Sequence, residues 1–201
     1  MIRIAYLQDL DRIKEITEAC ALHMESKGIF QWNTSYPSRE AFEEDIEKKE
    51  LYVYIERDNK DNEKEELLGC MVMSEEKDEV YANVYWPSMG LQSQPSTSAK
   101  LPSTSNQDKG VSEDNVQCFY IHRLAVDPSF QGSGIGQKLM NYAERYGREK
   151  GYISIRLDTF SLNERNQRFY TSLGYKKLDH NNNVFFPDQS EHPFYCFEKI
   201  L

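Results

Sequence analysis

Long apolar runs are absent from this 201-residue chain, and no stretch approaches the roughly 20 residues that a membrane-spanning helix needs. The N-terminus also lacks the pattern of a signal peptide, because its first residues run directly into an alternating strand. We therefore expect a cytoplasmic protein that has no membrane partner.

Cysteine is scarce as well. The four cysteines are widely scattered and lack the Cys-x-x-Cys spacing of metal sites; each lies inside an apolar segment: Cys20, Cys70, Cys118 and Cys196. We expect them to be buried, reduced thiols, and no pattern predicts a metal site.

An excess of basic residues is missing too, since the formal net charge is -9. Nucleic-acid binding requires a basic surface, so the composition argues against a nucleic-acid partner. An acidic surface is compatible with a cationic amine substrate, although a role in solubility explains the total charge more simply.

Two kinds of phosphate-binding loop are also lacking. The chain contains no Gly-Lys-Ser or Gly-Lys-Thr, which end a triphosphate-binding loop. A dinucleotide-binding loop counted from Gly132 and Gly134 requires a third glycine where Gln137 stands. Neither of these two nucleotide-binding classes is therefore predicted.

The chain nevertheless has a glycine-rich turn at residues 131–136, between an apolar strand and a long amphipathic helix. Glycine lets the backbone approach a phosphate closely, and the first N–H groups of a helix have no acceptor within the helix. They point at an anion along the positive end of the helix dipole. The turn predicts a pyrophosphate site that needs no lysine, and a simple tight turn is the alternative.

Strand and helix patterns alternate along one domain of residues 1–201. Helical spacing covers residues 10–24 and 135–150; Ser38 is a good N-cap for a second helix, and Ser161-x-x-Glu164 resembles a capping box for the last one. Strands are expected at residues 2–4, 51–55, 67–73, 116–126, 153–157, 175–178 and 194–200. We expect an α/β (α+β) fold with a mixed, mostly antiparallel sheet flanked by helices, rather than a doubly wound fold.

Residues 87–115 differ in composition from the rest, because Ser, Thr, Pro, Gln and Asn dominate and large apolar residues nearly vanish. Such a segment cannot bury enough surface to offset the entropy of ordering it. We expect a mobile, low-complexity insertion, either a plain surface loop or a lid or docking segment.

The motif Gln-x-x-Gly-x-Gly follows Leu124-Ala125-Val126-Asp127-Pro128 and precedes Asn163 and the run Phe169-Tyr170-Thr171-Ser172-Leu173-Gly174-Tyr175. Together these resemble the GNAT family of N-acetyltransferases, which uses acetyl-CoA. The resemblance covers about residues 119–178, with a weaker likeness over residues 2–24.

The resemblance implies which residues bind the cofactor. The strand at Leu124, Ala125 and Val126 is expected to splay from its neighbour and hold the pantetheine arm through its backbone. Asn163 stands where the family usually contacts this arm. Asn166 departs from the alanine often found there, as either an added contact or a surface residue. The pyrophosphate is assigned to Gln131, Gly132, Ser133, Gly134, Ile135 and Gly136.

The resemblance also implies two catalytic candidates. Tyr170 matches a tyrosine whose hydroxyl protonates the departing CoA sulfur, and a core tyrosine is the alternative. His122 lies two residues before Leu124, so alternation places it on the same face as Tyr120 and Leu124, and its titration range suits proton removal near neutral pH. Many family members instead carry a glutamate at the position of Tyr120. Three alternatives to His122 as the base stay open. A base could act through water, the reaction could need no dedicated base, or His122 could be a structural histidine of the strand.

We expect direct transfer of an acetyl group to the primary amine of a small molecule or amino-acid-like acceptor. The segment 28–37 carries Phe30, Trp32 and Tyr36, which either wall the acceptor pocket or simply pack the loop. The alternatives are a non-catalytic acyl-CoA sensor or scaffold and a protein or peptide N-acetyltransferase. A homodimer stays open, because no residue pattern decides the oligomeric state.

Overall fold

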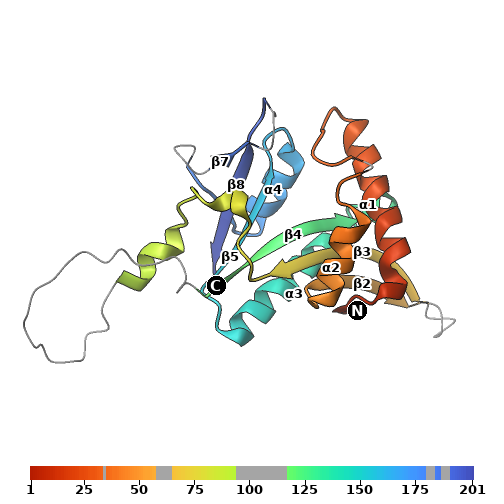
Figure 1. The fold of residues 1–201 in the computed structure, drawn as a ribbon, viewed down its shortest axis with the longest axis horizontal. Coiled ribbons are helices and arrows are strands. Elements are labelled where there is room, and N and C mark those ends of the chain that lie inside the picture. Colours follow the sequence, from red (N-terminus) through yellow and green to blue (C-terminus); the bar gives the residue numbers. More distant parts are fainter. Residues whose placement is uncertain (34, 58–64, 94–116, 180–183, 187–190) are drawn as a thin grey trace, which may run out of the picture.

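The computed structural model describes residues 1–33, 35–57, 65–93, 117–179, 184–186 and 191–201. Its sheet has eight strands in the order β1-β2-β3-β4-β5-β8-β6, with β7 also paired to β8 (Figure 1). Among the strands of the described residues, only β4 and β5 pair in parallel. The strands are β1 (Ile2–Ile4), β2 (Leu51–Arg57), β3 (Glu65–Ser74), β4 (Cys118–Val126), β5 (Ser154–Phe160), β6 (Lys176–Lys177), β7 (Val184–Phe185) and β8 (Phe194–Ile200). The predicted mixed, mostly antiparallel sheet is confirmed.

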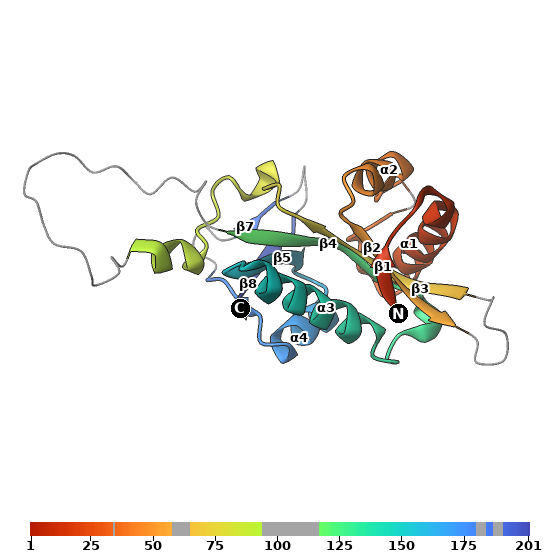
Figure 2. The same ribbon diagram turned by 90° about the horizontal axis from the view of Figure 1, so that it is seen from below.

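Four α-helices cover the two faces of this sheet. Figure 2 shows α3 and α4 below it and α1 and α2 above it. Each helix turns an apolar stripe inward; in α3, Leu139, Met140 and Ala143 are fully buried. The helices are α1 (Leu10–Glu25), α2 (Arg39–Glu47), α3 (Ile135–Lys150) and α4 (Glu164–Ser172).

Helix ends follow local capping chemistry. Ser38 caps α2 as predicted, because its hydroxyl accepts the Ala41 N–H at 3.2 Å. The predicted capping box that begins at Ser161 is wrong: Asn163 caps α4, and its side chain accepts the N–H of Asn166. Asparagine caps a helix as well as serine does, and here it stands two residues closer to the helix.

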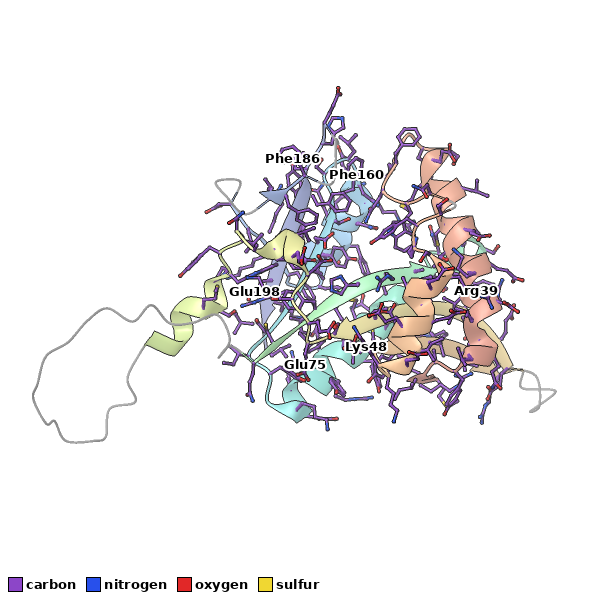
Figure 3. The ribbon with its side chains drawn as sticks, in the orientation of Figure 1. Arg39, Lys48, Glu75, Phe160, Phe186 and Glu198 are labelled. Atoms are coloured by element: carbon purple, nitrogen blue, oxygen red, sulfur yellow. The ribbon has the colours of Figure 1, made fainter. Side chains whose placement is uncertain are left out.

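Of the 3₁₀ helices in the described residues, η2 (Glu79–Tyr81) and η5 (Pro128–Phe130) contribute residues to the cleft described below, whereas η3 (Pro87–Ser93) packs against β8. Ordered structure thus enters the predicted insertion, because Ser88 in η3 is fully buried and its N–H donates to the Glu198 carboxylate at 3.0 Å. Figure 3 shows Glu198 on β8. Residues 94–115 of the predicted insertion lie outside the described residues.

A β-bulge interrupts β4 at Arg123, whose φ of 52° lies in the left-handed region. Cys70 of β3 pairs with Ala125, but Val72 pairs with His122. Two residues of β4 therefore oppose one residue of β3, and the alternation of side chains changes phase at this point.

The bulge corrects one prediction about the faces of β4. Tyr120 and His122 stack on one face, with ring centroids 6.2 Å apart. Beyond Arg123, Leu124 joins Ile121 in the core under α3, on the opposite face. The prediction that His122 and Leu124 share a face is wrong, because simple period-two alternation does not hold across a bulge.

The four cysteines are free, and three of them are fully buried, while Cys118 is half-buried. Burial raises the pKa of Cys20 to about 11. Among the described residues, no helix combines the length and apolar character needed to cross a membrane.

Candidate active site

The site begins where two parallel strands part. β4 and β5 pair from Cys118 with Ser154 to Ile121 with Leu157, and no pairing follows beyond these residues. The remaining residues of β4, together with Asp158 and Phe160 of β5, line a cleft of about 1300 Å³. The splayed strand that the resemblance implies is thus present in the described part of the chain.

The glycine turn lies at one end of this cleft. Gly132 and Gly134 have φ values of 89° and 84°, and a side chain added at either would meet no atom within 4 Å. Gly134 precedes the first residue of α3, Ile135, and no side chain caps the helix. The first N–H groups of a 16-residue helix are therefore open to an anion.

One basic side chain contacts the glycine turn, and two others line the same cleft. Arg165 and Arg168 of α4 and Lys27 after α1 line the cleft. The Arg165 guanidinium donates to the Gln131 side chain and so fixes the start of the glycine turn. Ser133 turns its hydroxyl to the Phe130 carbonyl at 2.6 Å instead of into the cleft. Open backbone amides beside cations fit a diphosphate, so these residues suit the pyrophosphate of CoA.

The backbone of β4 past the bulge supplies further polar groups. The Asp127 N–H donates to the Leu68 carbonyl of β3 at 2.9 Å. Successive peptide groups alternate in direction, so the peptide groups of Leu124 and Val126 face the side where β5 has departed and that of Ala125 faces β3. The Val126 carbonyl accepts from Gln131 at 3.4 Å, which leaves the two N–H groups for an extended ligand.

Asn163 and Asn166 both lie in the cleft wall. The Asn163 side chain is only 3% exposed, because it caps α4 and donates to the Gln31 amide oxygen at 3.0 Å. Asn166 donates to the Thr159 hydroxyl at 3.3 Å. Gln31 is a partner of Asn163 that the sequence pattern did not indicate, and it competes for the side-chain amide that a ligand arm would use.

Tyr170 projects from α4 into the core and reaches the cleft. Its ring packs against Tyr175 and Phe197 at centroid distances of 6.2 and 5.9 Å. Burial raises the pKa of its hydroxyl, and the nearby Asp158 charge raises it further. The hydroxyl is thus protonated at neutral pH and able to act as an acid.

His122 reaches the cleft from the opposite face of β4. Burial lowers its pKa to about 4, and the charge of Arg123 contributes in the same direction. The imidazole is therefore neutral at pH 7, but it titrates well below the range expected from its ordinary pKa. A neutral ring with so low a pKa is a weak proton acceptor.

Sequence reasoning named none of the cleft's arginines, lysines or aspartates, and Arg123 and Asp158 are the two that lie at the fork of β4 and β5. The Arg123 guanidinium is held by both oxygens of Asp45 at 2.9 and 3.0 Å. Asp158 follows the last β4-paired residue of β5, Leu157, and receives a hydrogen bond from the Tyr81 hydroxyl. In the sequence, apolar residues alternate with the polar residues Ser154, Arg156 and Asp158. This alternation was the available signal that Asp158 lies on one face of β5 with the other two.

Aromatic side chains form the outer walls of the cleft. Phe30 is 69% exposed, and Phe160 and Phe194 lie 5.4 Å apart across β5 and β8. Figure 3 shows Phe160 on the half of the molecule that carries α4 and β8. The cleft-lining aromatic residues are Phe30, Trp32, Tyr36, Phe130, Phe160, Phe169, Tyr170, Phe185 and Phe194.

A model of the acetyltransferase (GNAT) family matches residues 11–175. Since this match covers well over half of the sequence, the chain belongs to the GNAT family of acetyltransferases.

Individual relatives match shorter segments. The uncharacterized N-acetyltransferase YesJ of Bacillus subtilis (strain 168) is 32% identical over 78 residues, which are 38% of this chain and 43% of that protein. N-acetyltransferase 8B of Homo sapiens is 33% identical over 70 residues, or 35% and 30% of the two chains. The chain thus spans less than half the length of these curated relatives.

Solved structures share the fold over the whole chain. A GNAT-family acetyltransferase from Listeria monocytogenes 4b F2365 has a TM-score of 0.66 at 19% identity, covering 100% of this chain and 94% of that one. The structure of yncA from Salmonella typhimurium, with its cofactor acetyl-CoA, has a TM-score of 0.61 at 17% identity and coverages of 100% and 93%. At these identities the likeness concerns the fold.

Proposed function

We propose that this protein transfers an acetyl group from acetyl-CoA directly to the primary amine of a small molecule. The observation that carries the proposal is the gap between β4 and β5, which joins the open glycine turn to Tyr170 on one face and to His122 on the other. When bound, the cofactor supplies the acetyl thioester.

The residues divide the work along the cleft. The N–H groups of Gly134, Ile135 and Gly136 bind the pyrophosphate, and those of Leu124 and Val126 hold the arm in the gap. This placement orients the reacting carbonyl toward the face that carries His122.

Transfer requires a neutral amine and an acid for the leaving thiolate. Tyr170 is protonated and donates its hydroxyl proton to the sulfur as the carbon–sulfur bond breaks. His122 stays uncharged beside the acceptor nitrogen, so it does not repel an ammonium group.

Acetyl-CoA binding by calorimetry, followed by thiol release across primary amines, polyamines, amino acids and peptides, tests the proposal. Release that depends on a small amine is the expected result. Binding without release from any acceptor would identify a sensor, release with peptides alone would identify a peptide acetyltransferase, and absence of binding would refute the proposal.

A further inference from the structure

Asp158 occupies the fork of the two strands. Its neighbour Leu157 makes the last pair with β4. The partner of Leu157 in this pair is Ile121, and His122 is the next residue of β4. Ile155 and Leu157 face the core under α3, so Asp158 points to the opposite face, where His122 and Tyr81 stack at 6.3 Å. The carboxylate therefore lies on the face from which the acceptor approaches, at the narrow end of the gap.

The partners of this carboxylate leave room for a ligand. The Tyr81 hydroxyl donates to Oδ2, and no described residue donates to Oδ1. No described lysine or arginine pairs with Asp158, and Arg123, the cation on the neighbouring strand, is already bound to Asp45. Asp158 is half-buried and lines the cleft, so its carboxylate is open to a cationic ligand that would supply the missing partner.

The surrounding groups set the protonation state of Asp158. Burial raises its pKa to about 6, the Tyr81 hydrogen bond opposes this rise, and the charge of Asp78 adds to it. Cys196 of β8 lies directly opposite and stays a thiol, since burial raises its pKa. His122 is neutral and Tyr170 is protonated at pH 7, so neither offers Asp158 a charge.

A carboxylate in this state suits two tasks. Ionised at neutral pH, it attracts an ammonium ion into the cleft between aromatic walls, which stabilise an organic cation. Because an efficient base has a pKa near the working pH, it also accepts a proton from that ion more readily than His122 does.

We infer that Asp158, positioned by Tyr81, binds the ammonium group of the acceptor and takes its proton before attack. This inference rests on the proposed function and names the group that selects a cationic primary amine. The proton passes to a carboxylate oxygen, the freed nitrogen lone pair forms the bond to the acetyl carbon, the carbon–sulfur bond breaks, and the sulfur receives the Tyr170 proton. The nitrogen then loses one of its two remaining protons and keeps the other as the amide N–H. The released proton restores the Tyr170 hydroxyl, and Asp158 returns its proton to water.

The central test is the pH dependence of kcat/KM for the acetyl-CoA-loaded enzyme with a primary amine. The base must be ionised, so kcat/KM is expected to rise with pH through about 6 in the wild type. Asp158→Asn should lower kcat/KM about a hundredfold and abolish this limb. Acetyl-CoA affinity should stay unchanged, because the proposed cofactor contacts are made by the glycine turn and the backbone of β4 and not by Asp158.

Two further variants act on the pKa of Asp158 in opposite directions. Tyr81→Phe removes a donor to the carboxylate and should move the limb to higher pH. Asp78→Asn removes a like charge and should move it to lower pH. These shifts test the assignment even if Asp158→Asn fails to fold.

Amine binding gives a readout independent of turnover. Calorimetry with the CoA-loaded protein at pH 8 should show amine affinity falling about tenfold or more in Asp158→Asn, since a charge-assisted contact is lost.

Two results would overturn the inference while the acetyltransferase activity stands. The rise of kcat/KM near pH 6 could persist in Asp158→Asn, or it could move in the same direction in Tyr81→Phe and Asp78→Asn. A limb near pH 4 would assign the proton to His122. No amine-dependent thiol release by the wild type would instead refute the proposed function, and this inference with it.

Discussion

Replacing Tyr170 with phenylalanine removes one hydroxyl group and leaves the aromatic packing in place. The ring is buried among Phe169, Tyr175 and Phe197, so the fold should keep its stability. Loss of a general acid typically costs 10²–10⁴-fold in rate. We expect kcat to fall about a hundredfold, which corresponds to about 2.7 kcal/mol of transition-state stabilisation.

Tyr175 offers a matched control for this substitution. Its hydroxyl is buried without a hydrogen-bond partner among the described residues, and its ring belongs to the same core cluster. Tyr175→Phe should therefore leave turnover unchanged and keep or slightly raise stability.

The assay is steady-state thiol release with saturating acetyl-CoA, combined with calorimetry for cofactor affinity. The expected pattern is a lower kcat at unchanged acetyl-CoA affinity in Tyr170→Phe. Equal kcat values in the two tyrosine variants would refute the role of Tyr170 as the thiol acid.

Gly134→Val directs a side chain into the open turn, so acetyl-CoA affinity measured by calorimetry should fall at least tenfold, about 1.4 kcal/mol. The control is Gly151→Val, at a similar φ of 80°, which imposes the backbone strain alone and should leave acetyl-CoA affinity unchanged. Glu198→Gln strands the buried Arg156 charge and should cost about 3–5 kcal/mol in urea unfolding, whereas Glu164→Gln at the exposed pair with Arg168 should cost under about 1 kcal/mol. Folding raises the pKa of Asp158 from its ordinary value of 3.8 to about 6. The stability of the wild type therefore falls as the pH rises from 3.8 to about 6. Asp158→Asn should then be more stable than wild type at pH 7, by about 3 kcal/mol at most, and lose this advantage at pH 4. A stability difference between Asp158→Asn and the wild type that stays the same at pH 4 and pH 7 would contradict this last prediction.

The fold was largely predictable because local patterns and packing agree. The apolar stripe of α3 and the alternation in β1 fix these elements without tertiary information. The expected strand at residues 175–178 contains β6, whereas the two-residue strand β7 carries no periodic signal and was not predicted; both pair with β8.

The site was predictable where it depends on backbone. The glycine turn has left-handed glycines and an uncapped helix start, both of which follow from sequence. The faces of His122 and Leu124 were not predictable, because the bulge at Arg123 arises from pairing with β3.

Electrostatic properties were the least accessible to sequence reasoning. The depressed pKa of His122 and the raised pKa of Asp158 both arise mainly from burial, which depends on distant elements. The bond from Asn163 to Gln31 likewise joins residues 132 positions apart.

The ion pair between Asp45 and Arg123 links α2 to the bulge of β4. Asp45 is 7% exposed and holds the side chain of the strained bulge residue through both oxygens. No described residue of α2 lines the cleft. A substitution that removes the Asp45 carboxylate would take two hydrogen bonds from the Arg123 guanidinium, so a residue outside the cleft would change the electrostatics of a side chain that lines it.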